Sequence, residues 1–465
     1  MVKDGIAKTV GVSLDKFFYA RSVAVIGASR EVGKVGYTIL ESLKQGYTGK
    51  IFPINPTTDE ILGLKCYKSV LDVVDIIDVA VIAVPKGVVP RVLKDCVKIG
   101  VEAVVIITSG YSEIGDKKSE QELLKIIKGT KTRIIGTNCL GILDGHTNVD
   151  TLFLSENKLI RPPRGNISFT SQSGAFGSTI LDLITTECVG LSKFVSYGNQ
   201  IDLKDIDFLE YFGQDEKTKV IVSYIEGVSD GRRFMDVVRK IVKRKPIIVF
   251  KSGKTEKGSK AAASHTGSLA GSYNIYKAAF KQSGVLEATS VEDIFDFAKA
   301  LDMQKPAKGG KIAIVTNGGG FGVITSDCIE TSELNLAEFS KTSCNKLRKV
   351  LPVYGNVNNP LDLVGDADKE RYRKSLEILI EDRGVDGIII ISLFQTAGLD
   401  PGIVDVIVDI KNKTEKPIVI CATGGDYTKK YLKELDSLGI PTYPTPERAV
   451  KAMWALVKYG EILGS

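Results

Sequence analysis

The sequence has 465 residues, of which 43% are hydrophobic and 25% are charged, an ordinary globular composition that at about 150 residues per domain predicts three domains. Its 62 basic and 56 acidic residues leave a net charge of only +6, which argues against a nucleic-acid-binding protein but allows local basic sites for phosphate. No apolar run approaches the ~20 residues of a membrane helix, and neither a signal-peptide core nor a Cys-x-x-Cys pair is present, so we expect a cytoplasmic protein without membrane association, disulfide frame or metal site.

The first predicted unit begins with a strand, a glycine turn and a helix. Residues 22–28 form a short β-branched run that includes Gly27, and a helical pattern follows over residues 35–43. Such a turn can hold phosphate through the free N–H groups of the helix start. The spacing does not fit a P-loop, because five residues separate Gly27 from Gly33. It does not fit a dinucleotide fingerprint either, because the second glycine is missing and the second strand ends at Asn55 instead of an acid.

Strands and helices then alternate as in a doubly wound parallel sheet. The predicted strands cover residues 79–85, 103–110 and 133–141, and the predicted helices cover residues 88–99 and 117–128. Ligands of such sheets lie beyond the carboxyl ends of the strands. This rule gathers four residues around one crevice: Ser29, Pro85, Gly110 and Asn138. Two of them, the proline and the glycine, can equally be ordinary strand terminators.

A linker-like stretch, residues 144–164, precedes the second predicted unit. After the first strand of this unit, a helix is expected to run to about Ile184. Ser173 is a good N-terminal cap for this helix. If it is the cap, the N–H groups of Gly174 and Ala175 face whatever binds at the helix start.

Two further strands of the second unit end close to chemically active side chains. The strand of residues 220–227 includes Glu226 near its end, and the strand of residues 245–253 leads into a Gly-, Ser- and Lys-rich segment that contains His265. Because both follow neighbouring parallel strands, the two side chains can lie close in space. Taken singly, Glu226 is more simply a surface carboxylate and His265 a loop histidine. The only other histidine, His146, is assigned no role.

The third unit repeats the second. Residues 310–327 align with residues 165–182 without a gap and are identical at six of 18 positions, which indicates two copies of one flavodoxin-like domain. The third unit has no histidine, and its corresponding strand ends without a glutamate. A site present in one copy only suggests a function added to a shared fold. The predicted domains are residues 1–145, 146–303 and 304–465.

Glu226 and His265 together suggest phosphoryl transfer. An imidazole nitrogen is a good nucleophile when an acceptor holds the other ring nitrogen. A glutamate in that position would fix the tautomer and stabilise a phosphohistidine. The helix after Ser173 would offer N–H groups and the positive end of its dipole to phosphoryl oxygens, each such interaction contributing about 0.3–2 kcal/mol.

Five short segments, taken in order, resemble one protein family. They are Val25–Ser29, Thr137–Gly141, Ser171–Phe176, Tyr224–Gly227 and Ser264–Ser268. This set is similar to the α subunit of ADP-forming acetyl-CoA synthetase, of the NDP-forming acyl-CoA synthetase group related to succinyl-CoA synthetase. The resemblance covers essentially the whole chain. It implies a Rossmann-like CoA-binding domain followed by two flavodoxin-like domains, and an acid–CoA ligase that converts acyl-CoA, ADP and phosphate to acid, CoA and ATP.

The resemblance also implies roles for particular residues. His265 would carry the phosphoryl group as a phosphohistidine, and Glu226 would orient and stabilise it. Phosphate would bind at Ser171, Gln172, Ser173, Gly174 and Ala175. CoA would bind at Gly27, Ser29, Arg30, Lys34, Asn55, Pro85, Gly110 and Asn138. The nucleotide and Mg²⁺ would be held mainly by a separate ATP-grasp β subunit, in an α2β2 assembly, because all three units are accounted for as doubly wound domains.

Two other functions remain open. The chain can be a CoA-binding regulator or protein-acyltransferase scaffold without synthetase chemistry, although the histidine segment argues against this. It can also be an NAD(P)-dependent Rossmann oxidoreductase, which the missing second glycine and Asn55 disfavour. The sequence leaves the preferred acyl group and the choice between ADP and GDP open.

Overall fold

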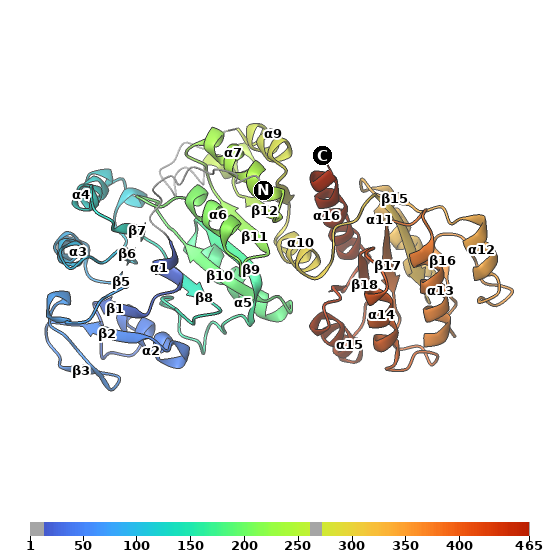
Figure 1. Cartoon of the computed structure of the whole chain (residues 1–465), viewed down its shortest axis with the longest axis horizontal. Helices are drawn as coiled ribbons and strands as arrows, with labels where there is room; N and C mark the ends of the chain where they lie inside the picture. Colours follow the sequence, from blue (N-terminus) through green and yellow to red (C-terminus); the bar gives the residue numbers. More distant parts are fainter. Residues whose placement is uncertain (1–13, 261–271, 465) are drawn as a thin grey trace, which may run out of the picture. The chain divides into compact units, whose positions relative to one another are not determined.

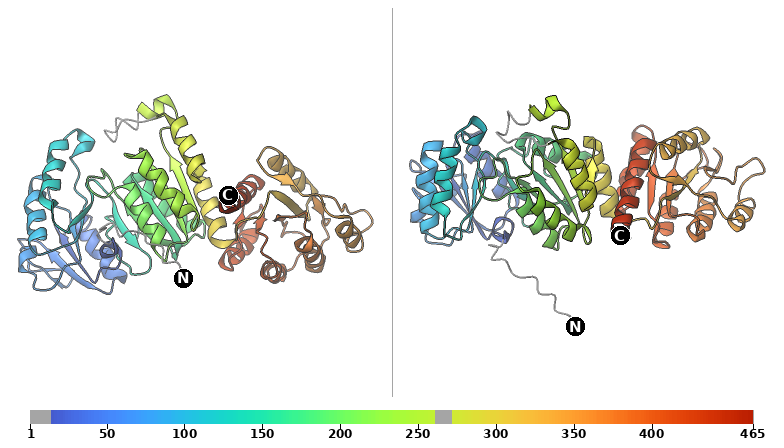
Figure 2. Two further views of the ribbon diagram at one scale, coloured as in Figure 1. Left: turned by 45° about the horizontal axis from the view of Figure 1, so that its top comes forward. Right: turned by 90° about the horizontal axis from the view of Figure 1, so that it is seen from above.

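The computed structural model describes residues 14–260 and 272–464. The chain divides into two compact units, the first made of Met1–Thr186, Gly190–Val237 and Lys251–Lys277 and the second of Glu187–Val189, Val238–Phe250 and Ala278–Ser465. Three main sheets with helices packed on them are visible along the chain (Figure 1), and the same layering is seen from two further directions (Figure 2). None of the helices in the described ranges has the length and apolar character needed to cross a membrane.

The first sheet has five parallel strands in the order β2-β1-β5-β6-β7. Its elements are α1 (Asp15–Phe18), β1 (Ser22–Ile26), α2 (Val35–Gly46), β2 (Lys50–Ile54), the small β3–β4 ribbon (Glu60–Ile61 and Leu64–Lys65), β5 (Val79–Ile82), α3 (Val89–Lys98), β6 (Ala103–Ile106), α4 (Lys117–Ile127) and β7 (Arg133–Gly136). All the helices predicted here are observed within a few residues. The start of α4 is fixed by the carboxylate of Asp116, which accepts a hydrogen bond from the N–H of Ser119.

The central strands of the first sheet are buried on both faces. Alternate residues such as Ala80 and Ile82 on β5 and Val104 and Ile106 on β6 belong to one apolar cluster with the inner sides of α3 and α4. The intervening residues, such as Val81, are also buried. Continuous apolar runs of this kind are what a parallel sheet covered on both faces requires.

The second sheet has the order β13-β12-β11-β9-β10-β8. Its elements are β8 (Gly141–Asp144), β9 (Arg164–Ser171), α5 (Gly174–Thr186), β10 (Leu191–Ser196), α6 (Asp205–Gln214), β11 (Val220–Ile225), α7 (Gly231–Val242), β12 (Ile247–Lys251), α9 (Tyr273–Ser283), β13 (Leu286–Ala288) and α10 (Val291–Met303). Numbered along the chain from β9, the five parallel strands have the order 2-1-3-4-5. This is the order of a flavodoxin-like domain, which the sequence predicted. The first sheet has the same order.

The edge strand β8 corrects one sequence-based expectation. The segment up to Gly141 was expected to close the first sheet, with a linker beginning at Asp144. Instead, β8 pairs antiparallel with β10 of the second sheet. The chain therefore crosses between the two sheets directly after Gly136, ahead of the predicted boundary at residue 145.

The third sheet has the order β15-β14-β17-β18-β19, again 2-1-3-4-5, with β16 paired to β14. Its elements are β14 (Lys311–Thr316), α11 (Gly319–Glu330), β15 (Asn335–Leu336), α12 (Lys341–Leu347), β16 (Leu361–Asp362), α13 (Lys369–Glu381), β17 (Gly387–Ile391), α14 (Ile403–Asn412), β18 (Ile418–Cys421), α15 (Asp426–Ser437), β19 (Thr442–Tyr443) and α16 (Pro446–Gly464). The gap-free repeat is confirmed in space, because α5 and α11 begin at the aligned residues Gly174 and Gly319.

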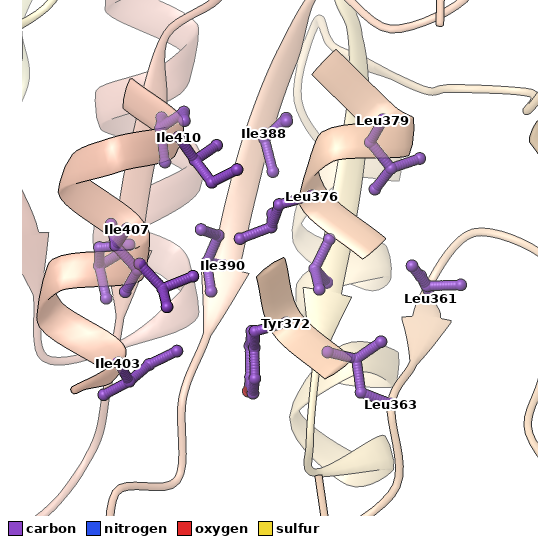
Figure 3. Close-up of a cluster of buried hydrophobic side chains, with 14 of the residues drawn as sticks. Leu361, Leu363, Tyr372, Leu376, Leu379, Ile388, Ile390, Ile403, Ile407 and Ile410 are labelled. Carbon is purple, nitrogen blue, oxygen red and sulfur yellow. The ribbon is translucent and has the colours of Figure 1, made fainter. Parts of the chain in front are cut away.

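In the core of the third domain, helices α13 and α14 pack on strand β17. Leu376 and Leu379 of α13 and Ile407 of α14 pack from two sides onto Ile388 and Ile390 (Figure 3). All five side chains are fully buried. Packed apolar contacts of this kind fix the helices on the sheet and leave the carboxyl ends of the strands for function.

Candidate functional site

A cavity of about 1060 Å³ lies within the first unit, where the carboxyl ends of the first sheet face those of the second. From the first sheet it is lined by Ala83 and Val84 after β5 and by Asn138 after β7. From the second sheet it is lined by the start of α5 and by Glu226 after β11. All these residues follow the carboxyl ends of strands, and those after β5, β9 and β11 lie next to the point where the strand order reverses, which is the usual ligand position in doubly wound sheets.

Gln172 connects the two strand ends of the second sheet. Its side-chain oxygen Oε1 accepts hydrogen bonds from the N–H of Glu226 at 2.9 Å and of Gly227 at 3.3 Å, while its own N–H donates to the carbonyl of Tyr224 at 3.3 Å. The start of α5 and the end of β11 are therefore held together by one amide side chain. Gln172 is one of the five predicted phosphate-binding residues, and its side-chain oxygen is used in these two hydrogen bonds, which we call the Gln172 brace.

Ser173 caps α5, as predicted. Its hydroxyl oxygen accepts a hydrogen bond from the N–H of Phe176 at 3.2 Å. Gly174 and Ala175 line the cavity, so their N–H groups lie at the wall of the cavity where an anion would be stabilised by the helix dipole. Ser171 is different, since its buried hydroxyl donates to the carbonyl of Ser173 at 2.6 Å and does not line the cavity.

Glu226 is buried, with only 6% of its surface exposed. The hydroxyl of Tyr224 donates to its Oε1 at 3.4 Å, and the ring of Tyr224 stacks on Phe176 of α5 at a centroid distance of 4.0 Å. Burial, followed by the neighbouring carboxylate of Glu226, raises the pKa of Tyr224 to about 12. This tyrosine therefore remains a proton donor to the carboxylate over the whole physiological pH range.

His265 lies outside the described residues, but Lys251 and Tyr276, which precede and follow its segment in the sequence, both contact the main chain at residues 226–228. On the incoming side, Lys251 at the end of β12 donates from Nζ to the carbonyl of Glu226 at 2.8 Å. On the outgoing side, Tyr276 of α9 accepts a hydrogen bond from the N–H of Val228 at 3.2 Å, and Lys251 Nζ lies 4.7 Å from the centre of its ring. Residues on both sides of the segment in the sequence are thus held beside the end of β11, and the pairing of His265 with Glu226 stays a prediction.

The predicted CoA-binding loop of the first sheet is built by close backbone contacts. Gly27 has a φ of +93°, and a Cβ at this position would lie 2.3 Å from the carbonyl oxygen of Ala83. Only glycine fits here. Asn55 is used to shape the same loop, because Nδ2 donates to the carbonyl of Ala28 at 2.7 Å and Oδ1 accepts from the N–H of Thr57 at 2.8 Å.

The other predicted CoA-binding residues fall into two groups. Ser29, Arg30 and Lys34 belong to the loop before α2, where Ser29 accepts a hydrogen bond from the N–H of Glu31 at 3.0 Å and Lys34 is exposed. Pro85 precedes the turn that carries Lys86, whose Nζ donates to the carbonyl of Gly110 and forms an ion pair with Asp116 at 2.5 Å. Asn138 alone of the eight lines the cavity directly, in a left-handed conformation with a φ of +53°.

Sequence reasoning missed one part of the site, the turn after β10. Gly198, Asn199 and Gln200 line the cavity, as does Glu113 from the first domain. The rule that ligands lie beyond strand ends was applied to β9, β11 and β12 but not to β10, although Gly-Asn-Gln after an apolar run is a visible turn signal.

Three family models together cover most of the chain. A CoA binding domain matches residues 21–144, a succinyl-CoA ligase like flavodoxin domain matches residues 164–301, and a ligase-CoA domain matches residues 312–461. The three ranges correspond to the three sheets, in the same order.

Several curated relatives are named as ADP-forming acetate–CoA ligases. The acetate–CoA ligase [ADP-forming] II subunit alpha of Pyrococcus furiosus is 42% identical over 459 residues, which are 97% of this chain and 99% of that protein. The acetate–CoA ligase [ADP-forming] of Methanocaldococcus jannaschii is 46% identical over 445 residues, which are 95% of this chain but only 62% of that protein. The chain therefore spans less than two thirds of some relatives and nearly the whole of others.

Solved structures show the same fold. The acetyl-coenzyme A synthetase 1 of Ca. Korarchaeum cryptofilum, in complex with phosphate and ADP, matches with a TM-score of 0.91 and 40% identity over 98% of each chain. A protein from Pyrococcus horikoshii matches with a TM-score of 0.88 and 38% identity over 97% of this chain. These values, together with the family models, confirm the predicted combination of a CoA-binding domain with two flavodoxin-like domains.

Proposed function

Because the chain belongs to the family of ADP-forming acetate–CoA ligases and matches their α subunits over nearly its whole length, we propose that it is the CoA- and phosphate-binding half of such an enzyme. The proposed reaction converts an acyl-CoA, ADP and phosphate to the acid, CoA and ATP. The observation that carries this proposal is the single cavity lined by Asn138 of the CoA-binding domain, by the start of α5 and by Glu226.

In the first proposed step, phosphate bound at the start of α5 attacks the carbonyl carbon of the thioester. A bond forms between a phosphate oxygen and this carbon, the carbon–sulfur bond breaks, and CoA leaves as a thiolate that takes up a proton. The N–H groups of Gly174 and Ala175 and the helix dipole stabilise the phosphate charge. Positioning makes up most of the catalytic effect, because the two reactants must be held about 3–3.5 Å apart.

In the second proposed step, an imidazole nitrogen of His265 attacks the phosphorus of the acyl phosphate, and the bond between phosphorus and the acyl oxygen breaks to release the acid. Glu226 accepts a hydrogen bond from the other ring nitrogen and stabilises the positive charge on the ring. Support comes from Lys251 and Tyr276, which precede and follow the histidine segment in the sequence and contact the main chain of Glu226 and Val228.

In the third proposed step, the phosphoryl group passes from the histidine to ADP on a partner subunit. Two relatives are named as α subunits, which implies a second subunit. We assign the nucleotide to an ATP-grasp β subunit in an α2β2 assembly, where Mg²⁺ would neutralise the phosphate charges. In this third step, the side chains of this chain would act only on the phosphoryl group that the histidine carries.

The proposal is tested with the purified chain and its partner subunit. Acetyl-CoA, ADP and phosphate should yield ATP and free CoA in equal amounts, and a panel of acyl-CoA substrates should define the preferred acid. Either subunit alone should give no ATP. Binding of CoA without any turnover by the complex would instead favour the regulator or acyltransferase scaffold.

A further inference from the structure

We propose that Asn199 is a positioning residue that clamps the CoA-binding domain against the phosphate-binding domain, so that the thioester is held at the start of α5. This inference rests on the proposed function. It concerns the segment Tyr197–Leu203, which follows β10 of the second sheet and is termed the clasp below. Both domains involved belong to the first unit of the chain.

The clasp donates three main-chain hydrogen bonds to the edge of the first sheet. The N–H of Asn199 donates to the carbonyl of Thr137 at 2.9 Å, that of Ile201 to Gly136 at 3.1 Å, and that of Leu203 to Ile134 at 3.3 Å. A segment of the second domain is thus hydrogen-bonded to β7, the edge strand of the CoA-binding domain, and to Thr137 directly after it. Paired backbone of this kind fixes the register between the two domains.

A half-buried ion pair between Arg133 and Asp202 holds the same register. The guanidinium of Arg133 donates to both carboxylate oxygens of Asp202, from Nε at 2.8 Å and from Nη2 at 3.0 Å. The N–H of Ile134 donates to the same carboxylate at 2.8 Å. Because a bidentate pair has only one good geometry, a sliding of the clasp along β7 would break it.

The two backbones also touch at Gly198. Its φ is +53°, and a Cβ at this position would lie 2.2 Å from the carbonyl oxygen of Thr137 and 2.3 Å from that of Asn138. A side chain cannot be accommodated against two main-chain oxygens. The clasp therefore contacts the two residues that lead into the cavity, without any intervening side chain.

The side-chain amide of Asn199 joins these elements to the carboxylates of the first domain. Its Nδ2 has two hydrogens, which donate to Oε2 of Glu113 at 2.6 Å and to Oε1 of Glu120 at 2.8 Å, and it also lies 3.1 Å from the hydroxyl of Thr137. Its Oδ1 accepts a hydrogen bond from Nδ2 of Asn138 at 3.4 Å. Asparagine suits this position because it supplies a neutral donor to two negative groups and an acceptor to a third group at once.

The pKa of Glu113 depends on the hydrogen bond from Asn199. Burial alone would raise the pKa of Glu113, but hydrogen bonds from Asn199 and from the N–H of Gly110 outweigh burial and lower the pKa. Glu113 therefore stays a carboxylate at the cavity wall. Without the amide, two carboxylates would face one another with fewer donors between them.

The contacts of the clasp lead directly to the phosphate site. Asn138 and Asn199 both line the cavity. Two residues after Asn138, the N–H of Leu140 donates to the hydroxyl of Ser196 at 3.1 Å, and a Cβ on Gly174 would lie 3.4 Å from the Cβ of Leu140. Asn138, which is predicted to bind CoA, is thus separated from the first turn of α5 only by a short stretch of chain that is held by these contacts.

A small movement of the clasp would therefore change the distance between the thioester and the phosphate. A misplacement of about 1 Å can cost about a hundredfold in rate. Transfer between ATP and the histidine does not involve CoA, so it should not depend on Asn199.

The test uses the reconstituted complex with Asn199→Asp, which keeps the size of the side chain, removes its donors and adds a third negative charge beside Glu113 and Glu120. We expect the Kd for CoA to rise about tenfold and the rate of ATP formation from acetyl-CoA to fall about tenfold to a hundredfold. Phosphorylation of His265 by ATP should stay within about twofold of the wild type. Asn358→Asp, an exposed substitution in the third domain, should change none of these values.

A double variant separates positioning from loss of folding. Glu120→Gln supplies a new amide donor opposite the aspartate of Asn199→Asp, so the double variant should recover a large part of the lost CoA affinity and rate. Unchanged CoA affinity and unchanged ATP formation in Asn199→Asp would overturn the proposal. An equal loss of CoA-dependent turnover and histidine phosphorylation, with no rescue in the double variant, would also overturn it. If the wild-type complex bound CoA but made no ATP, the proposed function would fail, while CoA affinity and its rescue would still decide the role of Asn199.

Discussion

The side-chain oxygen of Gln172 accepts the main-chain N–H of Glu226 at 2.9 Å. This one hydrogen bond joins the residue before the α5 cap to the main chain of Glu226, directly after β11. In the proposed reaction, phosphate binds at the first of these elements and phosphohistidine is stabilised at the second. The bond therefore sets the distance over which the phosphoryl group has to move.

Replacing Gln172 with leucine should slow phosphorylation of His265 without weakening CoA binding. The substitution leaves the N–H groups of Glu226 and Gly227 without their acceptor, and an unsatisfied buried donor costs about 1–3 kcal/mol. Displacement of Glu226 should lower the phosphorylation rate by about tenfold to a hundredfold. The rate is measured by rapid quench with labelled ATP, and Gln121→Leu on the exposed side of α4 is the matched control. A wild-type rate in Gln172→Leu would contradict the role of the brace.

Glu226→Gln should slow phosphorylation by a similar factor or more. The amide keeps the shape of the side chain but removes the negative charge that would stabilise a protonated phosphohistidine ring. CoA affinity, measured by calorimetry, should stay within about twofold, because CoA is assigned to the other wall of the cavity. A loss of CoA binding in this variant would place Glu226 in the CoA site and would overturn the assignment of the two walls.

Ser173→Ala should lower both stability and phosphate affinity. The hydroxyl accepts the N–H of Phe176 at 3.2 Å, and loss of such a cap costs about 0.5–2 kcal/mol. We expect a reduced free energy of unfolding in urea and a higher KM for phosphate. Ser173→Thr keeps the hydroxyl and should restore most of both quantities. Failure of threonine to restore stability would show that the cap is not the cause.

The sequence predicted the fold well because the relevant signals are local. Apolar runs separated by helical patterns gave the three sheets, and the repeat around Gly174 and Gly319 gave the equivalence of the last two domains. The aligned residues Gln172 and Asn317 even share their construction, since Oδ1 of Asn317 accepts the N–H of Leu393 at 2.9 Å. The third domain thus has the same amide brace without a carboxylate at its end.

The remaining parts of the site depend on contacts between distant segments. The pairing of β8 with β10 and of the clasp with β7 joins residues that no local pattern connects. The left-handed conformations of Asn138 and Gln200 arise from these contacts. The side chains of Ser171 and Asn55 shape turns through hydrogen bonds, and their predicted roles in binding stay predictions. His265 lies outside the described residues, so its pairing with Glu226 stays a prediction.

The stability of the protein should depend on the ionisation of Asp205. Its side chain is fully buried, and burial, which outweighs a hydrogen bond from the N–H of Ile206, raises its pKa to about 6. In the unfolded chain the pKa is about 3.9. The folded state therefore binds more protons between pH 4 and pH 6, so this group lowers the free energy of unfolding by up to about 3 kcal/mol as pH rises through that window.

Asp205→Asn should remove this contribution. Urea unfolding at pH 4 and pH 7 should show that the variant gains stability relative to the wild type at pH 7 but not at pH 4. The exposed substitution Glu216→Gln should leave the pH dependence unchanged. The same pH dependence in Asp205→Asn as in the wild type would show that other groups cause it.

Identification of the phosphorylated side chain tests the central claim most directly. The complex is incubated with γ-labelled ATP and Mg²⁺, and the label is located by digestion and mass spectrometry. The account predicts an acid-labile, alkali-stable phosphate on His265 that acetate and CoA discharge as acetyl-CoA and phosphate form. Label that persists on this chain in His265→Ala, or that withstands acid, would contradict it.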